Sequence, residues 1–221
     1  MRALILVAAL AGLAAAPLRA LELDLAGGPR AQLPLASVLA LRQTRTARQQ
    51  ADMSCGAAAL ATLLQFHYGQ AVSEGTLLQS MLARGERARL AREGLSLLDL
   101  QQELAARGWR ANAYAWPLAA VQQPAIVLLQ EGGQRHFVVL KGQDGRRVLL
   151  GDPARGLRAL PRAAFLAAWQ PAIVFVIDGP GRGRFNAPED WAAAPAAPLA
   201  ASLPRPDLSL LPLPGLWPGQ H

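Results

Sequence analysis

The chain contains a single cysteine, Cys55, in the stretch RQQADMSCGAAAL, where a polar segment gives way to an apolar one. The glycine, alanine and leucine residues that follow predict a helix that begins at Cys55 and ends at Gly69, with Ser54 as its N-cap. The free N–H groups and partial positive charge at a helix N-terminus stabilise a thiolate. Cys55 is therefore a candidate nucleophile, although a buried cysteine more often acts as a small hydrophobic residue.

A thiol nucleophile needs a base, and the chain offers three histidines. His67 lies on the same expected helix as Cys55, ~18 Å further along at ~1.5 Å per residue, which is too far for a hydrogen bond. His221 is the last residue of the sequence. His136 begins the strand-like stretch HFVVLKG after a glycine-rich turn and is left as the candidate base, although a lone histidine on a strand is often structural.

Two further groups would complete such a site. Asp152, in the stretch LLGDP, ends the strand after that of His136, so a hairpin brings the two side chains to the same end. An aspartate before a proline is also a common turn residue. A side-chain amide upstream of Cys55 would stabilise an oxyanion together with the Cys55 N–H, and Gln49 and Gln50 are the candidates, each also an ordinary choice for an exposed loop.

The turn between these two strands decides whether His136 and Asp152 share a face, because side chains alternate along a strand. A two-residue turn at Asp144-Gly145 would put them on opposite faces. A three-residue loop with Gly145 in the left-handed conformation, or an equivalent one-residue bulge, would put them on the same face. A catalytic pair therefore predicts the odd loop or the bulge.

Helical periodicity dominates the first half of the chain and short strands dominate the second half. Residues 72–92 predict two short helices, and EGLSLLDLQQELAARG predicts a clearer helix that is capped by Ser96 and ends at Gly108. Strands are expected in WRANAYAW, PAIVLLQ, HFVVLKG, RRVLLGD and AIVFVID, and a short helix in LPRAAFLAAW. This order predicts an α+β fold with segregated layers.

Four segments are expected along the chain. Residues 1–20 are typical of a signal peptide, because their apolar run is short for a bilayer span; an uncleaved membrane anchor is the alternative. Residues 21–47 form an N-terminal extension and residues 48–180 one domain. Residues 181–221 are rich in proline and predict a disordered or extended tail that could instead dock on a partner. A chain shortened to residue 183 is expected to keep its melting temperature.

Composition excludes several classes of site. The net charge of +7 does not indicate nucleic-acid binding, because the arginines are scattered and their densest cluster, ARGERARLAREG, contains acidic residues and no aromatic residue. One cysteine and three dispersed histidines give no metal-ligand spacing, so no metal or other cofactor is expected. A single thiol in an exported chain indicates a reactive or intermolecular cysteine, because exported proteins normally have paired cysteines or none.

The stretches RQQADMSCGAAALATLL, RHFVVLKG and VLLGDPARGLRALPRAAFLAAW together resemble the peptidase domain of the bacteriocin-processing, double-glycine cysteine peptidases, family thirty-nine of the papain-like clan. The resemblance covers residues 48–177. It implies a papain-like fold in which the nucleophile helix packs on a C-terminal antiparallel sheet. It further implies that Cys55 is the nucleophile, His136 the base and Asp152 its orienting partner. By the same resemblance, Gln49 and the Cys55 N–H form the oxyanion hole.

A signal sequence and the absence of a transporter domain resemble the stand-alone exported members of this family, some of which are found with secretion systems for functional amyloid fibres. The chain is therefore expected to be a periplasmic cysteine peptidase with a peptide or protein substrate and without a stable membrane anchor after signal cleavage. Secretion-system components are candidate partners. The alternatives are a non-catalytic peptide-binding or chaperone module on the same scaffold, and another amide-bond acyl-transfer activity.

Overall fold

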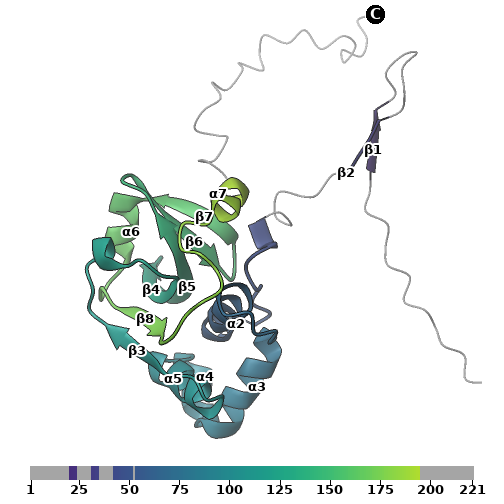
Figure 1. Cartoon of the computed structure of the whole chain (residues 1–221). Coiled ribbons are helices and arrows are strands. Elements are labelled where there is room, and N and C mark those ends of the chain that lie inside the picture. Colours follow the sequence, from purple (N-terminus) through teal and green to yellow (C-terminus); the bar gives the residue numbers. More distant parts are fainter. Residues whose placement is uncertain (1–19, 24–30, 35–41, 52, 195–221) are drawn as a thin grey trace, which may run out of the picture. The chain divides into compact units, whose positions relative to one another are not determined.

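The computed structural model describes residues 20–23, 31–34, 42–51 and 53–194 (Figure 1). The chain divides into two units, residues 1–38 and 39–221. The described part of the first unit is an antiparallel hairpin of two strands, β1 (Ala20–Leu23) and β2 (Ala31–Pro34). Nearly all of the expected signal peptide lies outside the described residues, as do the residues after 194 of the expected tail.

The second unit is built around a six-stranded antiparallel sheet with the strand order β3-β8-β4-β5-β6-β7. Five of its strands were expected, β3 from its alternating pattern and the other four from stretches rich in valine, isoleucine and leucine. β7 was not expected, because its sequence GLRALP contains no β-branched or aromatic residue. The strands are β3 (Ala111–Tyr114), β4 (Ala125–Glu131), β5 (Gln134–Gln143), β6 (Arg147–Asp152), β7 (Gly156–Pro161) and β8 (Val174–Ile177).

Helices cover both faces of this sheet (Figure 1). Helices α2 to α5 lie on one face and α6 on the other, so the fold is α+β and the layers are segregated as expected. Among the described residues, each helix is too short or too polar to cross a bilayer. The helices are α2 (Cys55–His67), α3 (Glu74–Arg84), α4 (Arg87–Glu93), α5 (Leu97–Ala106), α6 (Arg162–Ala168) and α7 (Pro188–Ala193).

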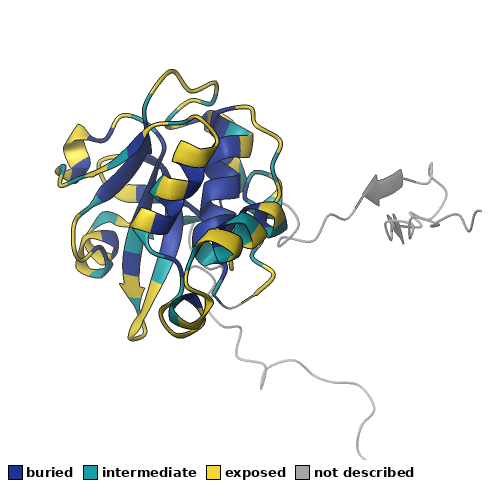
Figure 2. Cartoon of the chain, turned by 90° about the horizontal axis from the view of Figure 1, so that it is seen from below, coloured by how far each residue is buried: buried dark blue, intermediate teal, exposed yellow. Residues whose placement is uncertain are grey.

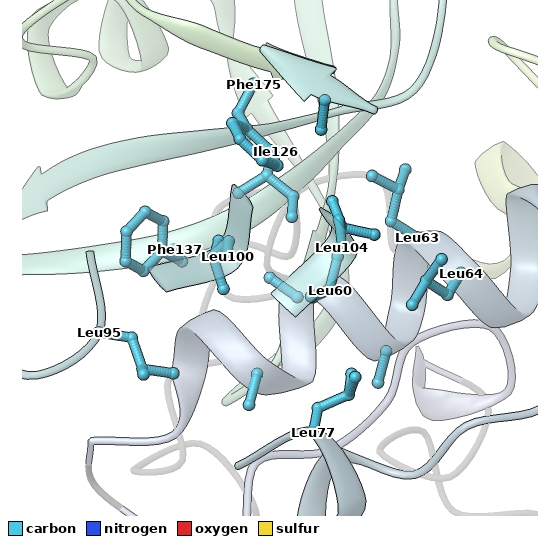
Figure 3. Packing of buried hydrophobic residues seen from close by; sticks show 14 of the residues in the cluster. Leu60, Leu63, Leu64, Leu77, Leu95, Leu100, Leu104, Ile126, Phe137 and Phe175 are labelled. Atoms are coloured by element: carbon cyan, nitrogen blue, oxygen red, sulfur yellow. The ribbon is translucent and has the colours of Figure 1, made fainter. Parts of the chain in front are cut away.

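The two faces of the sheet carry separate cores, because side chains alternate along each strand. On the α2 side, Val139 of β5 packs with Leu60 of the helix, and on the α6 side Val138 packs with Phe165. Figure 3 shows the α2 core, in which leucines of α2 and α5 meet Ile126 and Phe175 of the sheet. Helix α2 is buried on nearly all sides (Figure 2), which explains its continuous run of alanine and leucine.

Helix boundaries follow the sequence signals with one exception. Ser96 caps α5 in a capping box with Asp99, and Gly108 ends that region with a φ of 79°. Ser54 occupies the N-cap position of α2 as expected, but its side chain makes no capping hydrogen bond. Its hydroxyl instead donates to the carbonyl of Ala51, in the preceding turn, at 2.7 Å.

Residues outside both expected domain boundaries pack on the domain. Residues 42–47, assigned to an extension, pack on the domain: the Ala47 N–H donates to Thr62 of α2 at 2.8 Å. Residues 181–194, assigned to a loose tail, include α7, whose Asp190 is fully buried and forms an ion pair with Lys141. Pro188, one of the prolines that suggested disorder, is instead the first residue of α7, where its fixed φ suits a helix start.

Candidate active site

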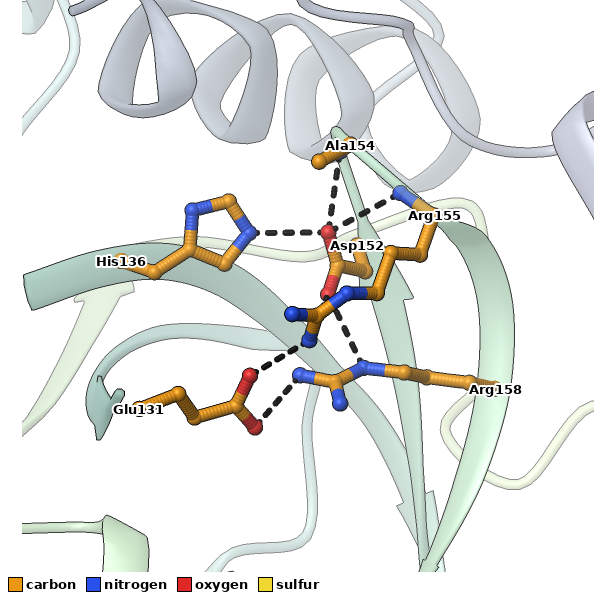
Figure 4. A network of polar contacts seen from close by, with 6 residues as sticks. All are labelled: Glu131, His136, Asp152, Ala154, Arg155 and Arg158. Carbon is orange, nitrogen blue, oxygen red and sulfur yellow. Dashed lines mark hydrogen bonds and ion pairs between the residues drawn. The ribbon is translucent and has the colours of Figure 1, made fainter. Parts of the chain in front are cut away.

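Cys55 is the first residue of α2, and its thiol faces His136 of β5. The His136 imidazole reaches Asp152 at the end of β6, with 2.8 Å between Nε2 and Oδ1 (Figure 4). Asp152 is fully buried, and the His136 side chain is 17% exposed. Three residues far apart in the sequence therefore form one chain of contacts, thiol to imidazole to carboxylate.

A β-bulge puts His136 and Asp152 on the same face of the sheet. Next to the turn, Gln143 pairs with Val148, a register in which the two side chains would lie on opposite faces. The bulge at Lys141 shifts the register by one residue, so that Val139 pairs with Gly151 and the two side chains share a face. The predicted one-residue shift is confirmed.

The turn itself is neither of the two that were expected. Strand β5 continues to Gln143 and β6 begins at Arg147, so the loop consists of the three residues 144–146. The Asp144 carboxylate accepts hydrogen bonds from the N–H groups of Arg146 and Arg147 and thereby closes the loop. The Asp144-Gly145 signal therefore marked a turn but did not determine its length.

Hydrogen bonds within the chain of contacts outweigh the effect of burial on its pKa values. Burial lowers the pKa of His136, but hydrogen bonds to Asp152 and Cys55 raise it to about 9. Burial raises the pKa of the Cys55 thiol, yet hydrogen bonds from His136 and the Phe137 backbone leave that pKa below its ordinary value. The arrangement thus favours a thiolate beside an imidazolium, the reactive state of a cysteine nucleophile.

Gln49 and Gln50 differ in their position relative to this site. Gln49 lines the cleft that also contains Cys55 and His136, and its side-chain oxygen is buried without a hydrogen-bond partner. Its N–H donates to the carbonyl of Pro153, next to Asp152, at 3.0 Å. Gln50 is exposed. Of the two candidates, Gln49 is the one that the fold brings to the cleft.

The family model described as "Peptidase C39 family" matches residues 43–180, more than half of the chain. The chain belongs to the Peptidase C39 family. It is a cysteine peptidase of this family, with a single cysteine in its sequence. The match begins at residue 43, which agrees with the packing of residues 42–47 on the domain.

Two relatives of this C39 peptidase carry the name "Probable functional amyloid protease FapD". The protein from Pseudomonas aeruginosa is 38% identical over 164 residues, 72% of this chain and 72% of the relative. The protein from Pseudomonas fluorescens is 35% identical over 195 residues, 86% of this chain and 84% of the relative.

Among solved structures, the peptidase domain of Streptococcus ComA, described as a bifunctional ABC transporter involved in quorum sensing, shares the fold. The TM-score is 0.51 at 18% identity, over 60% of this chain and 96% of that domain. The helix-on-sheet architecture of this C39 peptidase therefore matches that of a solved peptidase domain.

Around Asp152, the C39 peptidase has a charge network that the sequence did not predict (Figure 4). Asp152 Oδ1 accepts the N–H groups of Ala154 and Arg155 at 2.9 and 3.2 Å, and Arg158 Nε forms an ion pair with Oδ2 at 2.9 Å. Glu131 in turn binds both arginines. Burial raises the pKa of Asp152, but the hydrogen bond from His136 and the charges around it leave that pKa lowered. Arg158 was missed because its strand, β7, was missed.

The two histidines that were set aside remain outside the site. His67 is the last residue of α2, at the far end from Cys55, and is fully buried. Neither of its ring nitrogens has a hydrogen-bond partner. Burial and the positive charges of Lys141 and Arg45 lower its pKa to about 3. His221 lies outside the described residues.

The described residues do not bring together three His, Cys, Asp or Glu side chains that could hold a metal ion.

Proposed function

We propose that this cysteine peptidase is exported and cleaves a peptide bond in a secreted or periplasmic protein through a Cys55–His136–Asp152 triad. The contact of His136 with both Cys55 and Asp152 carries the proposal. The thiolate attacks the scissile carbonyl, and the imidazolium gives its proton to the leaving amine. His136 then takes a proton from the water that hydrolyses the thioester, while Asp152 holds the imidazole in place.

The oxyanion that forms on the attacked carbonyl would be stabilised by the backbone N–H of Cys55 and the side-chain amide of Gln49. The position of Gln49 in the cleft that also contains Cys55 and His136 supports this role. The side-chain oxygen of Gln49 is buried and has no hydrogen-bond partner, so no hydrogen bond through that atom holds the side chain away from the substrate.

The substrate belongs, on this proposal, to a secretion pathway for functional amyloid. The two relatives named as functional amyloid proteases support this, since each aligns over most of its own length. An N-terminal signal would place the peptidase in the periplasm, on the path that fibre subunits and secretion components take.

The test compares the peptide ends of envelope and secreted proteins in cells with the wild-type chain and in cells with Cys55→Ala. New N-termini that appear only with the wild type, in proteins of a fibre-secretion system, are the expected result. Fractionation of the same cells should recover the chain in the periplasm. Identical termini in both strains would refute peptide cleavage by Cys55 and favour a binding module.

A further inference from the structure

The bulge that aligns His136 with Asp152 leaves part of the sheet unpaired. Leu140 pairs with Leu150 and Gly142 with Leu149, so Lys141 has no partner residue on β6. Backbone groups near a bulge lose their ladder partners, and a buried group without any partner is destabilising. The bulge therefore needs hydrogen bonds from outside the ladder.

Asn186, just before α7, supplies these hydrogen bonds. Its backbone N–H donates to the carbonyl of Lys141 at 2.9 Å. Its side-chain oxygen accepts the N–H of Gln143 at 2.7 Å. Asn186 has a φ of 60°, a left-handed conformation that asparagine adopts more readily than most residues and that lets it bond on both sides of the bulge.

The fit between Asn186 and the bulge is close. A Cβ atom on Gly142 would lie 2.3 Å from the Asn186 side-chain oxygen and 3.1 Å from its Cα. Only glycine admits the segment at this distance. The Trp191 indole N–H, 3.3 Å from the same oxygen, further orients the Asn186 side chain.

Asp190, on α7, holds the side chain of the bulged residue. Lys141 and Asp190 are both fully buried, and Nζ lies 3.0 Å from Oδ2. Lys141 Nζ also donates to the carbonyl of Arg45 at 2.9 Å. A buried ion pair of this kind contributes little net stability, but it fixes the arrangement of the groups that it joins, because the Lys141 ammonium would be buried without its ionic partner if Asp190 were absent.

We propose that Asn186 and Asp190 are positioning residues for catalysis, which hold the bulge at Lys141 and so keep His136 and Asp152 on one face of the sheet. The proposal rests on the proposed function of that pair. Both residues lie beyond residues 43–180, the part that matches the family model, and neither lines the cleft. The segment after the peptidase domain thus acts on the site through the register of β5.

The test uses iodoacetamide alkylation of the full-length chain, since Cys55 is its one cysteine and all label reports on the site. Rates are measured from pH 5 to pH 9 for the wild type, for Asn186→Gly with Asp190→Asn, and for His136→Ala as the reference for a lost base. Asn186→Gly keeps the left-handed backbone and removes only the side-chain acceptor. Glu189→Gln is the matched control, an acidic residue of α7 that is half exposed and forms its ion pair with Arg45.

Cys55 of the wild type should react with iodoacetamide well below the pH at which an ordinary thiol ionises. Cys55 of His136→Ala should not react at that low pH. In the double variant we expect the rate at pH 6.5 to fall about tenfold or more, since each lost hydrogen bond shifts an equilibrium by roughly three- to tenfold. Glu189→Gln should react like the wild type. Asn186→Asp, which restores the acceptor, should recover most of the rate in the presence of Asp190.

A folded double variant with the wild-type pH profile would overturn the proposal, even if its melting temperature were lower. If the double variant does not fold, Asn186→Gly alone gives the same decision, with an expected decrease of about three- to tenfold. A wild type that reacts as an ordinary thiol, with no effect of His136→Ala, would instead refute the proposed function, and the positioning role would fall with it.

Discussion

A histidine lies at each end of helix α2, the largely buried His136 of β5 at one end and the fully buried His67 at the other, and the two are in opposite electrostatic states. At the N-terminal end, His136 contacts Asp152 and the Cys55 thiol, and its pKa rises to about 9. At the C-terminal end, His67 has no hydrogen-bond partner and lies near the positive charges of Lys141 and Arg45, so its pKa falls to about 3. Burial lowers the pKa of both. The partners, not the burial, decide which histidine carries a proton at neutral pH.

The two ends also differ in what the fold leaves open. The Cys55 end opens into a cleft between the α4–α5 connection and strand β5. The His67 end is closed by residues 182 and 183, whose N–H groups donate to the His67 carbonyl at 2.6 and 3.1 Å. A substrate can therefore reach one end of α2, while the other end is packed by the C-terminal segment.

Replacing His136 should have the largest effect and test the comparison directly. His136→Ala removes the proton acceptor and donor of the cleavage step, so the rate at which new peptide ends form should fall by roughly 10³-fold. His67→Leu, the matched change at the other end, should leave this rate within about twofold, because His67 contacts no group of the site. Equal losses in both variants would show that the two ends are not functionally distinct.

Removing the residues that follow Gly183 should have the next largest effect. A chain that ends at Gly183 loses Asn186 and Asp190 and leaves the Lys141 ammonium buried without its partner. Loss of one partner of a buried ion pair costs ~3–5 kcal/mol, and at ~2–4 °C per kcal/mol the melting temperature should drop by about 10 °C. Calorimetry checks this. An unchanged melting temperature would show that the residues after Gly183 do not stabilise the domain, as expected for the loose tail that the sequence suggested.

The next prediction tests Gln49 as an oxyanion donor at the Cys55 end of α2. Gln49→Ala should lower turnover by ~10²-fold, the usual effect of losing one oxyanion donor. Gln50→Ala is the neighbouring control and should change turnover little, because Gln50 is exposed. Turnover is measured as the formation of new peptide ends. A larger loss of turnover for Gln50→Ala than for Gln49→Ala would show that Gln50, and not Gln49, is the oxyanion donor.

The smallest effect concerns stability in acid at the far end. The pKa of His67 is about 3 in the folded state and 6.5 in the unfolded chain. Between pH 7 and pH 5 the His67 imidazole is therefore protonated only in the unfolded chain. Stability is therefore lost as the pH falls below 6.5, by about 2 kcal/mol at pH 5. His67→Leu should remove that part of the acid sensitivity in urea unfolding. The same pH dependence in variant and wild type would mean that His67 is protonated in the folded state.

The sequence by itself determined most of the helices and strands and the identity of the groups at the open end. Helix α2 follows from an alanine- and leucine-rich run that stops at Gly69, and β4, β5 and β6 follow from apolar stretches between glycine turns. These are local signals, set by the side-chain pattern within a few residues. Elimination among three histidines and a family resemblance were enough to select His136.

What only the tertiary structure decided are the long-range contacts. The bulge depends on Asn186 and Asp190, more than forty residues further along the chain. No local pattern marks that dependence, although the lysine within the apolar strand HFVVLKG was a signal that a buried charge needs a partner. β7 forms because β6 offers it an edge to pair with, and its own residues have no strong strand preference. From the sequence one could predict that His136 and Asp152 must share a face of the sheet for catalysis. The bulge that puts them there depends on the residues that pack against β5, because all the neighbours of a strand together set its register.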